Sequence, residues 1–387
     1  MSFYDSTPYF NHFNDSLIKT AGKSLDIVND SLRMLSELNR QYSTTLLPNT
    51  VILGIFGVVG VVGNILVFVI YGCGKTLKDK KFRYYVLSLA LIDFVTCVTC
   101  IPAEMVKHRS YFYFTERSLC KMKCFMNVFA AAATSFCLTM VAVDRYILTC
   151  RPLLFSKVPA LSHSVAWRLC VLMLVFAVLT SVPAAVLCGI TTYTITDNAG
   201  NNITVYVCET EPRYAIGVSR YIYRIALCGL QVIVSLLMIV LYARIGLTVS
   251  RAMKIREETE ARDIQMYDYR IHGRPRPKGH HYHGPVVNCR PWHQQHHIPT
   301  NIRLLFIVTV VFIVTYVLYV SLSWIDQTRL TQSEFLVFSM FYRSYFIHSI
   351  INPFLYVKMD KHFRKRCKEI VCSVLCINKT KRICYGH

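Results

Sequence analysis

Polar side chains occur inside stretches of this sequence that are otherwise apolar. The most costly of them is Asp93, because an ionised carboxylate is unfavourable wherever water is excluded. An aspartate without a basic partner in a neighbouring apolar stretch favours binding of a cation or a proton. The alternative is that Asp93 only accepts hydrogen bonds, with water between the partners. The residues that would form either site are Asn64, Asp93, Thr134, His348, Ser349 and Asn352.

The composition indicates which elements hold these side chains. Of the 387 residues, 53% are hydrophobic and 17% are charged, and the mean hydropathy is +0.37. This is too apolar for a soluble domain of such length, so we expect an integral membrane protein. The formal charge of +21 would suit a nucleic-acid-binding protein, but Lys and Arg cluster between the apolar runs. That pattern is typical of cytosolic loops, and we expect no nucleic-acid partner.

Seven apolar stretches reach the roughly 20 residues that a helix needs to cross a lipid bilayer. They cover residues 50–72, 84–107, 120–147, 166–188, 217–247, 300–325 and 333–357. The basic segments then share one side, predicted to be cytosolic, which places the amino terminus outside a plasma membrane. The expected organisation is an extracellular tail (1–49), a seven-helix domain (50–357) with a long cytosolic loop (248–299), and a cytosolic helix and tail (358–387).

The segments outside the helices carry weaker signals. Three sequons for N-glycosylation, at Asn14, Asn29 and Asn202, fall on the predicted outer face. Leucines and a valine repeat at helical spacing over residues 25–38, but short isolated helices are unstable in water, so we expect a mostly unstructured tail rather than a helix that touches a ligand. The histidine-rich segment 248–299 is expected to be disordered, with metal capture as the alternative.

The sixteen cysteines separate by compartment. Cys120 and Cys208 lie on the outer, oxidising side and form the expected disulfide. A different pairing stays open, because Cys100, Cys124 and Cys188 also lie in outer halves of the apolar stretches. Cysteines of the carboxyl-terminal segment follow the last stretch among basic residues, a setting that suits reversible acylation, with unmodified thiols as the alternative. The candidates for palmitoylation are Cys367, Cys372 and Cys376.

Two motifs stand at cytosolic ends of the apolar stretches. Asp144-Arg145-Tyr146 ends the third, and Asn352-Pro353-Phe354-Leu355-Tyr356 ends the seventh. Together with Gly63-Asn64, Asp93, Cys120, Trp167, Tyr242, Phe312 and Phe363, in this order, they make the chain resemble the rhodopsin-like (class A) G-protein-coupled receptors. The resemblance implies an all-α seven-helix bundle with a short amphipathic eighth helix, and a receptor rather than an enzyme. The residues implied in G-protein coupling are Asp144, Arg145, Tyr146, Tyr242 and Tyr356.

The resemblance also implies an activation switch and a sodium site, and both depart from the family pattern. The sixth stretch has Tyr316 and Leu318 where a tryptophan and a proline are usual, so its helix lacks the customary kink residue. Sodium, an allosteric ion in many relatives, would bind at Asp93, but His348 stands where an asparagine is usual. A protonated His348 would compete with sodium; a neutral one would leave sodium binding normal. The implied switch residues are Phe312, Tyr316, Asn352, Pro353 and Tyr356.

Two kinds of ligand that occur in this family, amines and retinal, are excluded by residues of this sequence. Amine receptors have an aspartate where this sequence has Asn127, and opsins have a retinal-linked lysine where it has Phe346. The residues left near the outer mouth are polar, aromatic and charged, which favours an extracellular peptide and places this chain nearest the peptide-receptor branch. A small acidic ligand is the second candidate, and a transporter or channel the rival class. The expected ligand-binding residues are Glu104, Asn127, Arg224, Tyr319, Tyr342 and Arg343.

Overall fold

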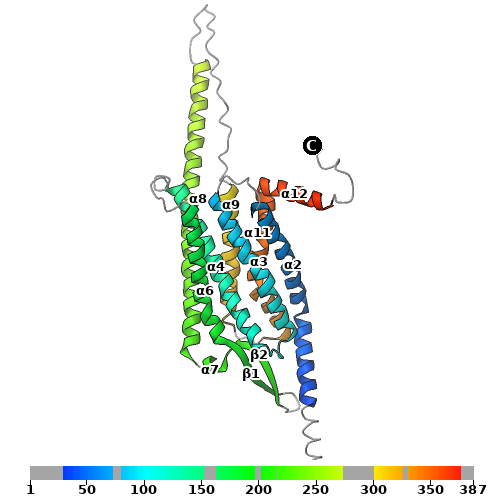
Figure 1. Ribbon diagram of the computed structural model, residues 1–387. Helices are drawn as coiled ribbons and strands as arrows, with labels where there is room; N and C mark the ends of the chain where they lie inside the picture. The colour runs from blue at the N-terminus through cyan, green and yellow to red at the C-terminus, as the bar shows by residue number, and fades with distance from the viewer. Residues whose placement is uncertain are drawn as a thin grey trace, which may run out of the picture.

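The structure, a computed structural model, describes residues 29–72, 80–151, 163–196, 202–215, 217–272, 300–325 and 330–375. Helices dominate these ranges and run side by side as a bundle, with a two-stranded hairpin at one end (Figure 1). The expected all-α membrane bundle is therefore confirmed. The spanning elements are α2 (Leu47–Val67) with a π-helical turn (Phe68–Gly72), α3 (Lys80–Arg109), α4 (Arg117–Cys150), α6 (His163–Leu187), α8 (Val218–His272), α9 (Thr300–Leu322) and α10–α11.

The seventh apolar stretch is the one that a single helix does not cover. Within the described residues, six helices are long and apolar enough by themselves to cross a membrane. The seventh stretch is divided into α10 (Gln332–Tyr342), a 3-10 turn (Ser344–Phe346) and α11 (Ile347–Met359). A capping box at Thr331 and Glu334 starts α10, and Pro353 lies inside α11. The division places His348, Ser349 and Asn352 on a helix that starts inside the bundle.

Helices α2, α3 and α11 pack unusually closely, and two glycines allow it. A Cβ at Gly60 would lie 2.3 Å from the sulfur of Cys97, and a Cβ at Gly63 would lie 2.6 Å from Cγ of Pro353. Either contact is too short for any larger residue. Asn64, next to Gly63, thereby reaches α11 and donates a hydrogen bond to the carbonyl of Ser349 at 3.0 Å.

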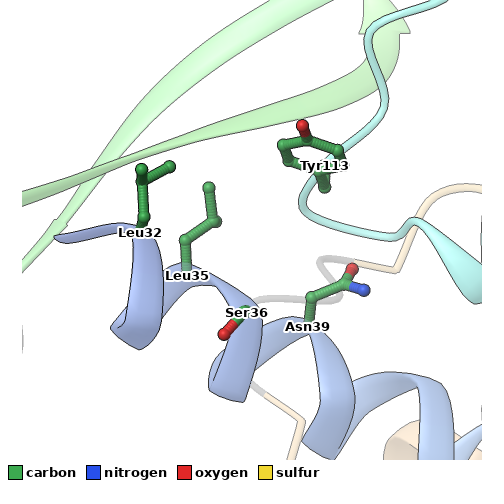
Figure 2. Close-up of a pocket in the computed structure, with 5 residues that line it drawn as sticks. All are labelled: Leu32, Leu35, Ser36, Asn39 and Tyr113. Carbon is green, nitrogen blue, oxygen red and sulfur yellow. The ribbon is translucent and has the colours of Figure 1, made fainter. Parts of the chain in front are cut away.

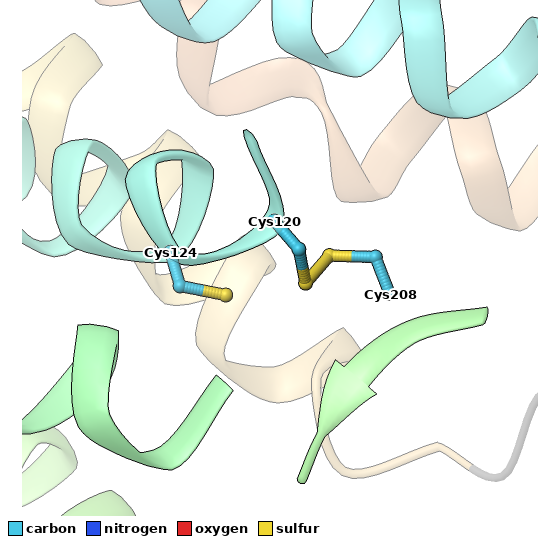
Figure 3. A group of neighbouring side chains, drawn as sticks. All are labelled: Cys120, Cys124 and Cys208. Atoms are coloured by element: carbon cyan, nitrogen blue, oxygen red, sulfur yellow. A yellow bond between two sulfur atoms is a disulfide. The ribbon is translucent and has the colours of Figure 1, made fainter. Parts of the chain in front are cut away.

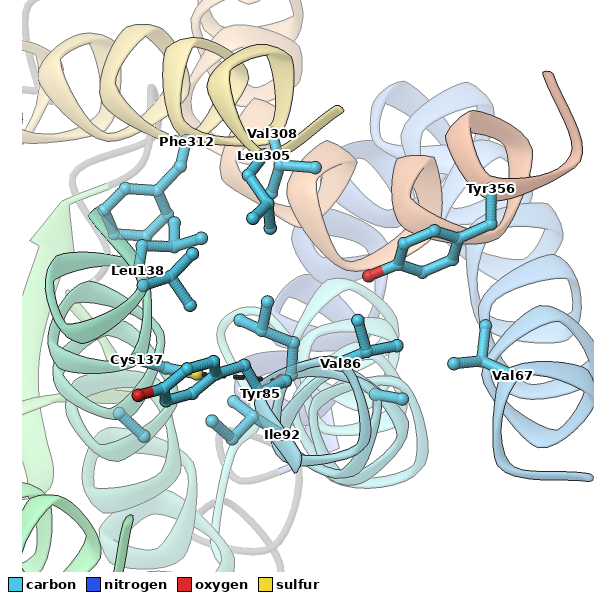
Figure 4. Close-up of a cluster of buried hydrophobic side chains, with 14 of the residues drawn as sticks. Val67, Tyr85, Val86, Ile92, Cys137, Leu138, Leu305, Val308, Phe312 and Tyr356 are labelled. Carbon is cyan, nitrogen blue, oxygen red and sulfur yellow. Dashed lines mark hydrogen bonds between the residues drawn. The ribbon is translucent and has the colours of Figure 1, made fainter. Parts of the chain in front are cut away.

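The core of the bundle fills the space between α2, α3, α4, α9 and α11. Figure 4 shows Val86 and Ile92 of α3 facing Leu138 of α4 and Leu305 of α9. Phe312 of α9 and Tyr356 of α11 are almost completely buried, with exposures of 0% and 1%. Both are implied switch residues, and they border one continuous apolar core.

One end of the bundle carries a β-hairpin that was not predicted from the sequence. Strand β1 (Cys188–Thr196) pairs antiparallel with β2 (Asn202–Thr210), and Ile190 lies opposite Cys208. β-Branched and aromatic residues fill both strands, which favours this structure. The loop before α4 adds to the edge of β2, since Phe114 N–H donates to the carbonyl of Tyr206 at 3.0 Å. The hairpin therefore forms a cover that is attached to the bundle.

The expectation of a mostly unstructured amino-terminal tail is wrong for residues 29–45, which are helical. Their apolar side, led by the buried Leu35, packs against Phe112 and the strand residues Val205 and Val207. Tertiary contacts thus supply the stability that an isolated short helix lacks. A half-open groove of about 280 Å³ lies between this helix and the loop before α4, lined by Leu32, Leu35, Ser36, Asn39 and Tyr113 (Figure 2).

The expectation of disorder in residues 248–299 is wrong for its first half. Helix α8 continues to His272 and extends beyond the end of the bundle opposite the hairpin (Figure 1). No glycine or proline interrupts the sequence from residue 247 to 272, and Arg256 pairs with Glu260 one turn later at 2.7 Å. The remaining histidines of this segment lie outside the described residues. Helix α12 (Lys361–Leu375) forms the predicted eighth helix.

Candidate functional site

A buried ionic cluster lies at the end of the bundle that carries the hairpin. Glu104 of α3 is 3% exposed, and each of its carboxylate oxygens has its own cationic partner. Oε1 accepts from Nζ of Lys123 on α4 at 2.7 Å, and Oε2 contacts Nη2 of Arg343 at 3.0 Å and Nε at 3.1 Å. Arg343 also donates to the carbonyl of Ser339 at 3.2 Å. The cluster therefore connects α3, α4 and the seventh span.

Aromatic side chains form the wall beside this cluster. The ring of Tyr319 on α9 lies 4.9 Å, centroid to centroid, from both Tyr342 and Tyr345. The hydroxyl of Tyr345 donates to Oδ1 of Asn127 on α4 at 3.2 Å. Arg224 of α8 lies at the rim, where its guanidinium donates to the carbonyl of Ser323 at 2.6 Å and stacks over Trp324 at 4.8 Å.

Two disulfides hold the hairpin over these residues. Cys120 and Cys208 are bonded as expected, with an S–S distance of 2.01 Å (Figure 3). A second bond joins Cys124 to Cys188, at 2.05 Å, so two of the three alternative cysteines form an additional bridge rather than a competing one, and Cys100 has a free thiol. The sulfurs of Cys120, Cys124 and Cys208 lie within 4.8 Å of one another, but all three are consumed by disulfides and do not form a metal site.

A separate acid directly follows β2. Glu211 pairs with Arg213 at 3.1 Å, Arg117 at 3.5 Å and Lys121 at 3.6 Å. Burial disfavours its charged form, but the hydrogen bond from Arg213 and the three positive charges outweigh burial and lower the pKa of Glu211 below its usual value. Glu211 therefore stays ionised and fixes the end of the hairpin to α4.

A second buried carboxylate, Asp93, lies deeper in the same helix. Its Oδ2 accepts a hydrogen bond from Nδ2 of Asn352 at 2.6 Å. Nε2 of His348 lies 3.8 Å from Oδ1. The Nδ1 atom of His348 contacts the carbonyl of Tyr345, and Nε2 lies 3.1 Å from the hydroxyl of Ser349. A neutral His348 satisfies both contacts, because Nδ1–H donates to the carbonyl and Nε2 accepts from the hydroxyl.

Three buried oxygens, of Asp93 and of two other residues implied in the sodium site, suit the ion that the resemblance implies. Oδ1 of Asp93, Oγ1 of Thr134 and Oδ1 of Asn352 are buried and have no hydrogen-bond partner among the described residues. Carboxylate, hydroxyl and amide oxygens are suitable ligands for a hard cation. Asn64 is oriented differently, since its Nδ2 donates to the carbonyls of Gly60 and Ser349. It supports α11 rather than Asp93 directly.

Phe312 and Tyr316, two of the aromatic switch residues, pack against His348 of the Asp93 cluster. The ring of Tyr316 is 4.4 Å from Phe312, 5.4 Å from His348 and 5.9 Å from Tyr345. The ionic cluster and the aromatic wall together form the mouth of the bundle. Tyr316 therefore lies between Tyr345 of this mouth and His348 of the Asp93 cluster. Helix α9 contains no proline, so the expected absence of the usual kink residue extends over the whole helix.

The end of the bundle opposite the hairpin gathers the residues of the two motifs. Nη2 of Arg145 lies 3.6 Å from Oδ2 of Asp144, and both side chains are buried. The hydroxyl of Tyr242 lies 3.4 Å from that of Thr309 on α9. Tyr356 packs against Tyr71 and Phe363, with ring centroids 5.6 and 5.7 Å away. These contacts join α8 to α9, and α2 to α11 and α12.

Comparison with known proteins identifies the architecture. The model of the family described as 7 transmembrane receptor (rhodopsin family) matches residues 63–356. The chain belongs to this receptor family. Membership decides against a transporter or channel and against an enzyme.

Several curated receptors match parts of the chain. The pyrokinin-1 receptor of Drosophila melanogaster is 30% identical over 155 residues, which are 40% of this chain and 35% of that receptor. The neuromedin U receptor homolog nmur-2 of Caenorhabditis elegans is 27% identical over 35% of this chain and 32% of its own length. The C3a anaphylatoxin chemotactic receptor of Oncorhynchus mykiss is 25% identical, covering 47% and 49%. The alignments thus span about a third to a half of these relatives.

The structure places most of the residues predicted for the receptor. The six expected ligand-binding residues lie at or beside the outer mouth, although their role in binding stays a prediction. Asn29 and Asn202 are exposed, and Cys367 and Cys372 are half-buried on α12. Asn14 and Cys376 lie outside the described residues. Lys123 and Tyr345 were not predicted from the sequence, although a lysine within an apolar stretch is costly and could have indicated Lys123.

Proposed function

We propose that this receptor binds an extracellular peptide at its outer mouth and activates a heterotrimeric G protein from the plasma membrane. The observation that carries the proposal is the mouth itself. Cationic, acidic, amide and phenol side chains from four helices converge under a hairpin that two disulfides attach. Such a site offers hydrogen bonds and apolar contact over a broad surface, which suits a peptide better than an amine or a lipid.

The named relatives support the same ligand class. The pyrokinin and neuromedin U receptors are named after peptides, and each matches part of this chain. A small acidic ligand is the second candidate function, favoured by Arg224 and Arg343 beside the mouth. The proposed orientation has the amino terminus and the hairpin outside the cell, and α12 and the extended α8 in the cytosol.

Cells that express the receptor would be screened against a secreted-peptide library, with G-protein nucleotide exchange as the readout. At least one peptide should raise exchange only when the receptor is present. The second arm uses Arg145→Ala, which should retain peptide binding but lose exchange, because Arg145 lies at the proposed G-protein face. Arg117→Ala, at the opposite end of the bundle, is the matched control. Exchange by Arg145→Ala equal to that of wild type would contradict the coupling role.

A further inference from the structure

The charges in the outer mouth do not balance. Its buried carboxylate, Glu104, already has both oxygens in contact with Lys123 and Arg343. A third cation, Lys107, lies one helical turn further out on α3. Among the described residues, no carboxylate lies within ion-pair distance of its ammonium. The mouth therefore holds three cations for one buried acid.

Lys107 is positioned to meet something that enters from outside. Its side chain is partly exposed, and its ammonium lies 5.7 Å from the centroid of the Tyr111 ring. It is close enough to Lys123 and Arg343 to feel their repulsion, and close enough to Glu104 and Glu209 to feel attraction. Glu209 does not close the gap, because it is exposed on β2 and accepts a hydrogen bond from Tyr193 at 2.9 Å.

A surplus ammonium at this depth costs free energy in the unliganded protein, since repulsion from two neighbouring cations adds to partial desolvation. An anion bound beside it would remove that cost. In an unmodified peptide the only anionic groups are carboxylates, on aspartate, on glutamate and at the carboxyl terminus. The aromatic wall of Tyr319, Tyr342 and Tyr345 next to the cations would cover an apolar neighbour of such a group.

We propose that the outer mouth is a carboxylate-binding site, in which Lys107 pairs with a carboxylate of the ligand beside Lys123 and Arg343. This deepens the proposed peptide function and rests on it. The ligand is accordingly a peptide that presents an unblocked carboxylate to the mouth, either its carboxyl terminus or an acidic side chain. A peptide with an amidated carboxyl terminus and no acidic side chain at its binding end would leave the charge of Lys107 without a partner.

The first test compares matched peptides. Every member of the secreted-peptide library is synthesised as the free acid and as the amide, and each active member is remade with Asp and Glu replaced by Asn and Gln. Active peptides should lose at least about tenfold in potency when one particular carboxylate is neutralised, the size expected for a hydrogen bond to a charged group. The position of that carboxylate distinguishes the terminus from a side chain. The proposal is overturned if the potency of the active peptides does not change when any of their carboxylates is neutralised.

The second test changes the receptor. Lys107→Met keeps most of the length of the side chain and removes its charge, and Lys107→Gln is the alternative if the first variant folds poorly. Either should weaken the acidic form of an active peptide by about tenfold or more and leave its neutralised form unchanged. Lys121→Met, a lysine paired with Glu211 outside the mouth, is the matched control. Equal weakening of both peptide forms overturns the pairing.

The third test needs no ligand and separates this inference from the proposed function. In purified receptor, Lys107→Met should raise the unfolding temperature by about 2 to 4 °C, because it removes an uncompensated charge. Lys123→Met should lower it, because it breaks the contact with Glu104. If no peptide activates the receptor, the proposed function fails. If Lys107→Met does not raise the unfolding temperature, the carboxylate site fails, whatever the peptides do.

Discussion

Two buried carboxylates on helix α3 have opposite surroundings. Glu104, at the outer end, has a cation on each oxygen, from Lys123 and Arg343. Asp93, deeper in the bundle, has the amide of Asn352 on one oxygen, and its other oxygen accepts no hydrogen bond from any described residue. The exposures of the two residues are alike, 3% for Glu104 and 0% for Asp93. Burial therefore does not distinguish them, whereas the charge of their partners does.

The difference indicates what each acid does. A carboxylate whose two oxygens both contact cations holds its helices together, and its charge is already compensated. A carboxylate with a vacant oxygen stores free energy that a cation or a proton can release. We infer that Glu104 acts as a structural connection between α3, α4 and the seventh span, and that Asp93 is the residue that responds to ions.

The largest expected effect is that of Glu104→Gln. This change leaves the charges of Lys123 and Arg343 buried without their partner, and breaking a buried ion pair in this way costs about 3–5 kcal/mol. Surface expression and the unfolding temperature should both fall sharply. Glu116→Gln, an exposed acid that precedes α4, should leave both unchanged. Adding Lys123→Gln to Glu104→Gln should recover part of the lost stability. If Glu104→Gln alone is as stable as wild type, the contrast drawn between Glu104 and Asp93 is wrong.

Asp93→Asn should have the opposite outcome on stability. No cation loses its partner, and the new amide oxygen can still accept from Asn352, so the unfolding temperature without sodium should equal or exceed that of wild type. The stabilisation that sodium gives to wild type, relative to a bulky organic cation, should disappear. A variant that keeps the sodium response would show that the ion binds elsewhere.

His348→Asn sharpens the assignment of Asp93, because His348 is the ionisable group nearest its vacant oxygen. If His348 becomes protonated in mild acid, its charge competes with sodium, so the wild-type sodium effect should be weaker at mildly acidic pH than at alkaline pH. His348→Asn should show the full sodium effect at both. The measurement is unfolding temperature in sodium or N-methylglucamine, at the two pH values. Equal sodium shifts in both proteins at both pH values would mean that His348 stays neutral.

Tyr345→Phe, between the two carboxylates, should have the smallest effect. It removes one neutral hydrogen bond, to Asn127, which contributes about 0.5–1.5 kcal/mol. An active peptide should lose less than about tenfold in potency, measured by concentration–response curves. Tyr319→Phe, whose hydroxyl lies 3.5 Å from that of Tyr342, is the parallel variant. A loss beyond a hundredfold would place the Tyr345 hydroxyl in direct contact with the ligand.

Local sequence was sufficient for the membrane-spanning segments. The stretch predicted at 50–72 is helical over 47–72, and the stretch at 84–107 lies within α3, because a bilayer requires a long apolar run whatever the neighbours are. From hydropathy, the fifth stretch was predicted to end at residue 247, whereas α8 continues to His272. Beyond the apolar stretch, residues 247–272 contain no Gly or Pro, so the helix continues to residue 272. Hydropathy does not reveal this property.

Disulfides and contacts between residues far apart in the sequence could be predicted only in part. The Cys120–Cys208 bond could be predicted from the compartment, whereas Cys124–Cys188 depends on the hairpin. Cys124 lies one turn after Cys120, and the register that sets Ile190 opposite Cys208 brings Cys188 near α4. Likewise, the helix at residues 29–45 is stable only because Leu35 finds a surface made by β2 and Phe112.

By itself, the sequence determined that the chain crosses the membrane seven times, which residues form the receptor motifs, and that Asp93 and Glu104 are carboxylates in apolar surroundings. Only the tertiary structure decided that Glu104 is paired and Asp93 is not. The cations that contact Glu104 come from α4 and from the seventh span, and their reach depends on how those helices pack. The free energy of a buried charge is set by atoms within a few ångströms, and spacing along the chain does not specify those atoms.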